Sequence, residues 1–109
     1  MAAEKKNWSI DQIEAVWIKT VGQTQEGKDS AGAIISFSQY GNTSTELNKG
    51  WEIDHIKPHS HGGSDNISNL RALHWENNRS KGDDYPKYTT VVSSENGRNT
   101  RKRISWIIK

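Results

Sequence analysis

The stretch Trp51-Glu52-Ile53-Asp54-His55-Ile56 decides the fold, because apolar and polar side chains alternate along it. This alternation is typical of a half-buried β-strand, in which successive side chains point to opposite faces. Pro58 and the pair Gly62-Gly63 follow, so we expect the strand to end in an ordered loop. Adjacent residues of a strand can share one site only where the strand bends or ends, and such an end is expected directly after the Asp-His pair.

The residues that follow predict the rest of a small structural unit. Residues 69–75 favour a second short strand, and residues 76–81 have the composition of a helical turn. A strand, a loop, a strand and a helix then occupy residues 51–82. The tail predicts a C-terminal β-hairpin with a basic arm, from a β-prone run, a turn signal and a return strand at residues 88–93, Asn96-Gly97 and residues 104–108.

The N-terminal half predicts one helix and one strand. Ser9 is placed to cap the helix, and Gln12 to complete a capping box. Residues 22–31 show no period and are interpreted as a loop, and residues 33–37 favour a short strand. The helix carries an apolar stripe at helical spacing, made by Ile10, Ile13, Val16 and Trp17.

The composition is that of one small α+β domain covering residues 1–109. The chain has 109 residues, of which 31% are hydrophobic, and its mean hydropathy is −0.93, so its core must depend on a few large side chains. Five tryptophans are the obvious candidates. We expect Trp17, Trp51 and Trp75 to be structural, since aromatic side chains in a chain poor in aliphatic residues pack in the core more often than they stack on bases.

Several classes of protein and site are excluded by what the sequence lacks. The chain has no cysteine, which excludes disulfides, thiol catalysis and thiolate zinc sites and leaves Asp, Glu, His and Asn as metal ligands. No run approaches the roughly 18 apolar residues of a membrane span, and residues 1–6 lack the apolar stretch of a signal peptide. We therefore expect a soluble, cytoplasmic protein.

Residues 54–81 combine side chains that suit metal-assisted cleavage of a phosphodiester bond. Such cleavage needs a base that activates water and positive charge where negative charge accumulates. His55 is the candidate base, because an ordinary histidine pKa near 6.5 leaves the proton-accepting form abundant at neutral pH. Asp54 and Asn78 offer the oxygen ligands that Mg²⁺ or Mn²⁺ prefers.

The stretch from residue 51 to 82 resembles the HNH endonuclease family, whose fold is the ββα-metal finger. Outside this stretch, Trp17 followed by a lysine, the Tyr40-Gly41-Asn42 turn and Gly50-Trp51 also look like small, free-standing bacterial members, so we expect a bacterial or phage origin. The resemblance to the family covers about thirty of the 109 residues. It rests on residues in order at the family's spacing: Ile53-Asp54-His55-Ile56, Pro58, Ser60, Gly62-Gly63-Ser64-Asp65, Ser68-Asn69-Leu70, Leu73 and Asn78-Arg79-Ser80-Lys81.

The resemblance implies a role for each signature residue. His55 would be the general base, Asn69 would fix the intervening loop and orient that base, and Asn78 would be the third signature residue. Asp54 and Asn78 would hold one divalent metal ion. We expect Mg²⁺, with Mn²⁺, Ni²⁺ and Zn²⁺ as alternatives.

The chain departs from the family in one respect. Many members carry cysteine pairs that bind a structural zinc, and here His74 and Asn77 occupy the positions of one pair. Without that zinc site, we expect the N-terminal helix and the strand at residues 33–37 to supply the packing that holds so small a finger.

Two further histidines leave alternatives open. His59 and His61 flank Ser60 in the expected loop, and with His55 and His74 they could form a zinc cluster. Alternatively they are exposed loop residues near the site, where either could touch a phosphate.

The charge is unevenly spread and points to a polyanion as partner. Residues 1–65 hold six basic and nine acidic side chains, and residues 66–109 hold nine basic and four acidic. The basic half predicts contacts with nucleic-acid phosphates, which are salt-sensitive and tolerant of sequence. The candidates for these contacts are Arg71, Arg79, Lys81, Arg98, Arg101, Lys102 and Arg103.

The sequence therefore predicts a metal-dependent endonuclease that hydrolyses DNA, most simply double-stranded DNA. A nucleic-acid-binding module without catalytic activity is the alternative, against which the intact set of Asp54, His55, Asn69 and Asn78 argues. The same nuclease could act as an antibacterial toxin domain, in which case a small inhibitor protein would be a further partner. The amino-acid sequence does not determine which DNA sequence is cut, whether one or both strands are cut, or the oligomeric state of the protein.

Overall fold

Two antiparallel strands and the helix that follows them form the centre of the molecule. In the computed structural model, which describes residues 7–109, β3 (Trp51–His55) pairs with β4 (Leu70–His74), and α2 (Trp75–Lys81) follows β4 directly. The register places Trp51 opposite His74 and His55 opposite Leu70. The strand, loop, strand and helix expected over residues 51–82 are confirmed, and the fold is α+β.

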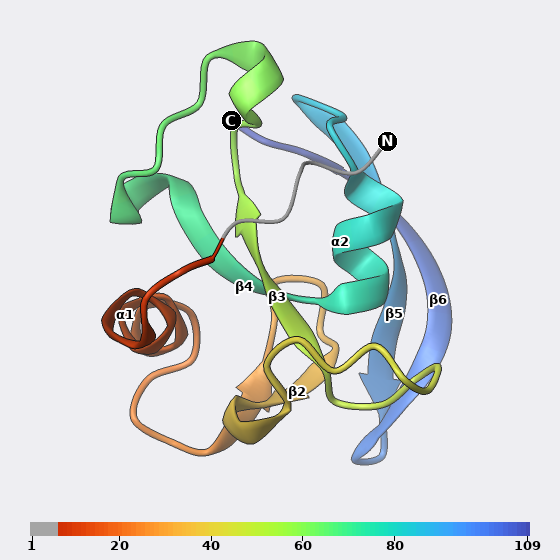
Figure 1. Cartoon of the computed structure of the whole chain (residues 1–109). Coiled ribbons are helices and arrows are strands. Elements are labelled where there is room, and N and C mark those ends of the chain that lie inside the picture. The colour runs from red at the N-terminus through yellow and green to blue at the C-terminus, as the bar shows by residue number, and fades with distance from the viewer. Residues whose placement is uncertain (1–6) are drawn as a thin grey trace.

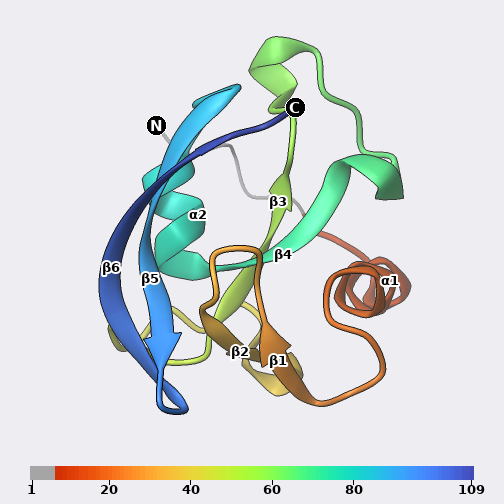
Figure 2. The same ribbon diagram turned by 180° about the vertical axis from the view of Figure 1, so that it is seen from behind.

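The two faces of the β3–β4 pair are covered by different parts of the chain. Figure 1 shows α1 (Ile10–Thr20) on one side of β3 and β4, and α2 on the other side together with β5 (Lys87–Glu95) and β6 (Arg98–Ile107). Seen from behind in Figure 2, β5 and β6 form a long twisted hairpin that curves around α2. This hairpin and its Asn96-Gly97 turn agree with the prediction for the tail.

The helix α1 begins as expected and presents a narrower apolar face than expected. Ser9 accepts a hydrogen bond from the backbone N–H of Gln12, whose side chain in turn accepts from the N–H of Ser9. Val16 and Trp17 are buried and Ile13 packs against the core from its edge, whereas Ile10, at the first position of the helix, is 73% exposed. Ile10 is therefore not part of the core.

Residues 22–31, interpreted as a loop, contain a short strand. β1 (Glu26–Lys28) pairs antiparallel with β2 (Ile34–Ser36), and Gly27 lies opposite Ile35. The prediction missed β1 because backbone hydrogen bonding to β2 holds it, and its own side chains are polar or absent. The strand expected near Ile35 is confirmed.

The core is a cluster of aromatic and aliphatic side chains from both halves of the chain. The ring centroids of Trp17 and Trp51 are 5.1 Å apart, and the two indole N–H groups donate to the carbonyl oxygens of Thr24 and Phe37. The buried members are Val16, Trp17, Ile35, Trp51, Ile53, Leu70 and Ala72. The N-terminal helix and the strand β2 thus supply the packing that the sequence predicts.

A buried carboxylate ties this core to α2. Asp29 is 5% exposed, and its Oδ1 accepts from the backbone N–H groups of Ala31 and Ala33 at 2.9 Å each. Its Oδ2 accepts from His74 N at 2.9 Å and from Asn77 Nδ2 at 3.2 Å. His74 and Asn77 stand where many HNH proteins carry zinc-binding cysteines, so hydrogen bonds to Asp29 join these positions to the rest of the fold.

Within residues 7–109, no helix has the length and apolar character needed to cross a membrane. Residues 1–6, on which the expectation of a missing signal peptide rests, lie outside the described part of the chain.

The Asp29 contacts predict a large loss of stability on substitution. Asp29→Ala would leave four donors without this acceptor, three of them buried backbone N–H groups, and should lower the free energy of unfolding by about 3 kcal/mol or more. Urea denaturation followed by tryptophan fluorescence measures this change. Asp83→Ala, at an exposed position, is the matched control and should be nearly silent; equal midpoints for the two variants would contradict the role assigned to Asp29.

Candidate active site

His55 stands at the end of β3, where the strand gives way to the loop. Its side chain is 14% exposed, and its Nε2 lies 2.7 Å from Asp65 Oδ1. A carboxylate can only accept a hydrogen bond, so Asp65 fixes the tautomer in which Nε2 carries the proton and Nδ1 carries the lone pair. Nδ1 is therefore the nitrogen of neutral His55 that can accept a proton.

Asn69 closes the loop that carries Asp65. Its Oδ1 accepts from the N–H of Lys57 at 2.8 Å, and its Nδ2 donates to the carbonyl oxygens of Lys57 at 3.0 Å and Ser64 at 2.7 Å. Gly63 is required at its position, because a Cβ there would overlap the carbonyl oxygen of Lys57. The two ends of the loop are thus joined immediately beyond His55.

Lys19 fixes the same loop from outside. Its ammonium donates to the carbonyl oxygens of Ile67 at 2.9 Å and Leu70 at 2.6 Å. Burial, and then the positive charge of Arg71, lower the pKa of Lys19. The last turn of α1 is therefore hydrogen-bonded to the end of the loop and the start of β4.

The loop brings a second histidine to the same carboxylate. His59 Nε2 lies 2.8 Å from Asp65 Oδ1, and the rings of His55 and His59 are 4.2 Å apart between centroids. One ligand atom from each of His55, His59 and Asp65 lies within 4.8 Å of the other two, so the three residues could hold a metal ion. Asp65 belongs to the sequence pattern without a predicted role, and its contacts with His55 and His59 become visible only in the closed loop.

The other two histidines lie elsewhere. The ring of His61 packs against Tyr85, with 5.6 Å between centroids. His74 is buried: its Nε2 donates to the carbonyl of Asn48 at 2.7 Å, and its Nδ1 accepts from the N–H of Glu76. Burial lowers the pKa of His74 despite the opposing hydrogen bond to Asn48. Of the zinc cluster considered from the sequence, the structure assembles only the His55 and His59 part.

Asp54 is buried between two cations. Its side chain is 3% exposed, and its two oxygens lie 2.9 Å from Arg71 Nε and 3.2 Å from Lys81 Nζ. Burial alone would lower the pKa of Arg71, but Asp54 and Tyr88 outweigh it and hold this pKa above its ordinary value. The charge of Asp54 is neutralised inside the protein.

Lys81 and Arg71, expected to contact phosphates, belong to this buried group. The side chain of Lys81 is fully enclosed, and its ammonium also donates to the carbonyl oxygen of His55 at 2.9 Å. Arg71, with 14% of its side chain exposed, also donates to the hydroxyl of Tyr88 at 3.1 Å. In this arrangement the two cations support the end of β3 rather than an outer surface.

Asn78 faces the carboxylate of Glu52, for which the sequence predicts no role. Its Nδ2 donates to Glu52 Oε1 at 3.0 Å, and Arg79 lies 3.2 Å from Glu52 Oε2. Glu52 and Asp54 lie on the same face of β3, as alternate residues of a strand do. Glu52 could have been found from that alternation, which places it on the face that α2 covers.

The predicted metal ligands do not fit a divalent cation in this arrangement. Both oxygens of Asp54 face positive side chains, which would repel a further cation. The amide of Asn78 directs an N–H group, not its oxygen, at the neighbouring carboxylate of Glu52. Ligation by Asp54 would require Arg71 and Lys81 to give up their contacts.

The remaining predicted phosphate contacts lie on the C-terminal hairpin. Arg101 is engaged by Glu46 at 2.8 Å and Glu76 at 2.7 Å, and hydrogen bonds to these carboxylates raise its pKa. Lys102 and Arg103 are exposed and form no ion pair with any of residues 7–109. At the register shift between Thr90 and Val92, Lys102 and Arg103 of β6 both lie opposite one residue of β5, Val91. Such a β-bulge redirects the side chains of the bulged strand.

The comparisons with known proteins bear on the same segment. The model of a family described as HNH endonuclease matches residues 42–84. No curated protein and no solved structure matches the chain. The matched residues include β3, the closed loop, β4 and α2, together with His55, Asn69 and Asn78. Residues 42–84 are therefore similar to the HNH endonuclease family, and their strand, loop, strand and helix are consistent with the ββα-metal fold.

Proposed function

We propose that the protein is a metal-dependent endonuclease that hydrolyses phosphodiester bonds of double-stranded DNA in the cytoplasm, with His55 as the general base. The observation that carries the proposal is the pairing of His55 with Asp65 at the end of β3, inside the segment that the HNH family matches. The pair has the arrangement of a general base and the group that orients it.

His55 would act through Nδ1. A water molecule transfers its proton to this nitrogen while its oxygen attacks phosphorus, and the imidazolium that forms is stabilised by the carboxylate of Asp65. The hydrogen bond from Nε2 keeps the ring in one orientation, and the contacts of Asn69 keep Asp65 in place. The chain therefore needs no rearrangement of the base before reaction.

A divalent ion, Mg²⁺ in our proposal, would supply positive charge at the phosphate and at the leaving oxygen. The sequence pattern proposes Asp54 and Asn78 as its ligands, but their present contacts with Arg71, Lys81 and Glu52 do not fit that role. We assign no step of the reaction to them.

DNA would bind across the surface that carries Arg79 and the bulged part of β6. A two-stranded β-ribbon fits the major groove of DNA, and β5 and β6 form such a ribbon. Lys102 and Arg103 at its bulge are the proposed phosphate contacts, and Arg79 is a third. Arg101 already has two carboxylate partners and should contribute less.

The role of His55 predicts the outcome of a plasmid-cleavage assay. His55→Ala should lower the rate of cleavage of supercoiled plasmid in Mg²⁺ by about 100-fold or more, because general-base catalysis contributes at least that factor. EDTA should stop cleavage by the wild type. His61→Ala, in the same loop but outside the site, should cut at the wild-type rate.

The result decides between the nuclease and the binding module. Equal rates for the wild type and His55→Ala would remove His55 from the mechanism. Retained DNA binding without cleavage in Mg²⁺ or Mn²⁺ would favour a module that keeps the HNH fold without catalysis.

The hairpin predicts a change in the salt dependence of binding. Replacing both Lys102 and Arg103 with Ala should weaken binding to duplexes of any sequence and reduce the slope of log K against log salt by about two, one for each lost phosphate contact. Fluorescence anisotropy at several salt concentrations measures this slope. Arg101→Ala is the control, and an equal or larger effect of that variant would refute the assignment.

A further inference from the structure

We propose that His55, His59 and Asp65 form a binding site for Zn²⁺ or a similar nitrogen-preferring ion, and that occupation of this site inhibits the nuclease by taking His55 away from catalysis. The inhibition rests on the proposed function, whereas the binding does not. The proposed site is separate from Asp54 and Asn78, the ligands that the family pattern implies.

The chemistry of the three donors selects the ion. Two imidazole nitrogens and one carboxylate oxygen match the ligand sets of Zn²⁺ with an open fourth position, whereas Mg²⁺ prefers an all-oxygen shell. The donor atoms of His55 and His59 already lie 2.7 and 2.8 Å from the same oxygen of Asp65. When the metal binds, each histidine stays neutral and its proton is carried by Nδ1, so that Nε2 offers its lone pair to the ion.

The side chains would have to adjust to close around an ion. Donor atoms in a tetrahedral zinc shell lie about 3.3 Å apart, so each nitrogen would move roughly half an ångström from Asp65, and the three donor atoms, now within 4.8 Å of one another, would converge on that spacing. The side chains of His59 and Asp65 are 52% and 39% exposed, which leaves them room for this movement. His55 can stay where β3 holds it.

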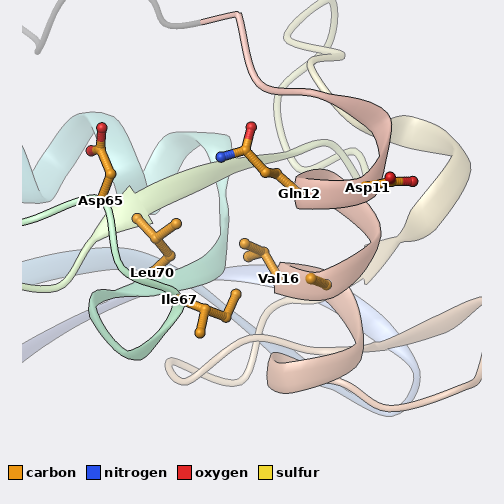
Figure 3. A pocket seen from close by; sticks show the side chains of 7 residues that line it. Asp11, Gln12, Val16, Asp65, Ile67 and Leu70 are labelled. Atoms are coloured by element: carbon orange, nitrogen blue, oxygen red, sulfur yellow. The ribbon is translucent and has the colours of Figure 1, made fainter.

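The backbone around the site is already ordered. The three hydrogen bonds of Asn69 and the close packing of Gly63 fix the loop that carries His59 and Asp65. Binding therefore does not have to pay the entropy of closing the loop. The site is also reachable, because Asp65 lies at the edge of an open groove between α1 and the loop, lined further by Asp11, Gln12, Val16, Ile67 and Leu70 (Figure 3).

Inhibition follows from the tautomers of His55. A neutral imidazole has one N–H group and one lone pair. In the metal-free arrangement Asp65 holds the proton on Nε2, and Nδ1 is the base. An ion bound at Nε2 uses the lone pair of that nitrogen and leaves the proton on Nδ1, so the base can no longer accept one. Metal binding at Nε2 and catalysis at Nδ1 exclude each other.

Zinc binding is tested first, by calorimetric titration of the metal-free protein with ZnCl₂ in excess Mg²⁺. The wild type should bind one Zn²⁺ per chain. His59→Ala should bind at least about tenfold more weakly, since even the loss of a group that only supports a metal ligand costs 10- to 100-fold. His59→Gln, which can still donate to Asp65, should behave like His59→Ala, and His61→Ala should match the wild type. Equal binding by the wild type and both His59 variants would overturn the site.

Inhibition is tested on the same proteins by plasmid cleavage in Mg²⁺ with increasing Zn²⁺, each rate normalised to that protein's own rate without Zn²⁺. Zn²⁺ should inhibit the wild type over the range in which it binds, and the His59 variants should need more Zn²⁺ by the factor measured for binding. Cleavage that is unchanged or accelerated by bound Zn²⁺ would overturn the inhibition. Absence of cleavage in Mg²⁺ alone would count against the proposed function, while the titration would still decide the metal site.

Discussion

The three hydrogen bonds of the Asn69 side chain are the interaction on which the candidate site depends. They join Lys57 at one end of the loop to Ser64 and the start of β4 at the other. The amide donates through both of its hydrogens and accepts through its oxygen. Among the other side chains only that of Gln offers the same donors and acceptor, and it is longer by one methylene. Because the loop closes there, His59 and Asp65 return to the end of β3 and meet His55.

Buried polar contacts hold the fold around this loop, at positions where many HNH proteins bind a structural zinc ion. Asp29 binds the two positions where many HNH proteins carry zinc-binding cysteines, and Asp54 joins Arg71 and Lys81 beneath the site. Buried charges are tolerated only when they are paired and hydrogen-bonded, and none of the buried side-chain polar atoms in residues 7–109 lacks a partner. These contacts let a chain without cysteine hold a finger of two strands and one short helix.

Features encoded locally could be predicted from the sequence. The capping box at Ser9 and the alternation along residues 51–56 gave the correct helix start and the correct strand, and the Asn96-Gly97 turn gave the hairpin. The strand β1 escaped prediction, because its pairing with β2 leaves no apolar pattern in its own residues.

Contacts between distant residues could not be predicted in the same way. Asp29 and Asp65 are isolated acidic residues in polar stretches of the sequence. No neighbouring residue indicates that Asp29 binds His74 or that Asp65 binds His55. Lys81 lies two residues after Arg79, and the sequence therefore indicates a basic surface. In α2, however, the side chain of Lys81 points inward and pairs with Asp54. The roles of His55, Asn69, Asp54 and Asn78 in catalysis stay predictions.

The tautomer that Asp65 imposes on His55 decides both which nitrogen acts as the base and how zinc would affect catalysis. Long-range ¹H–¹⁵N correlation NMR of the histidine rings in the metal-free protein, at a pH where His55 is neutral, observes this tautomer directly. We expect a protonated Nε2 and an unprotonated Nδ1 for His55, with the proton on Nδ1 after Zn²⁺ is added. A proton on Nδ1 before any metal is added would contradict this assignment.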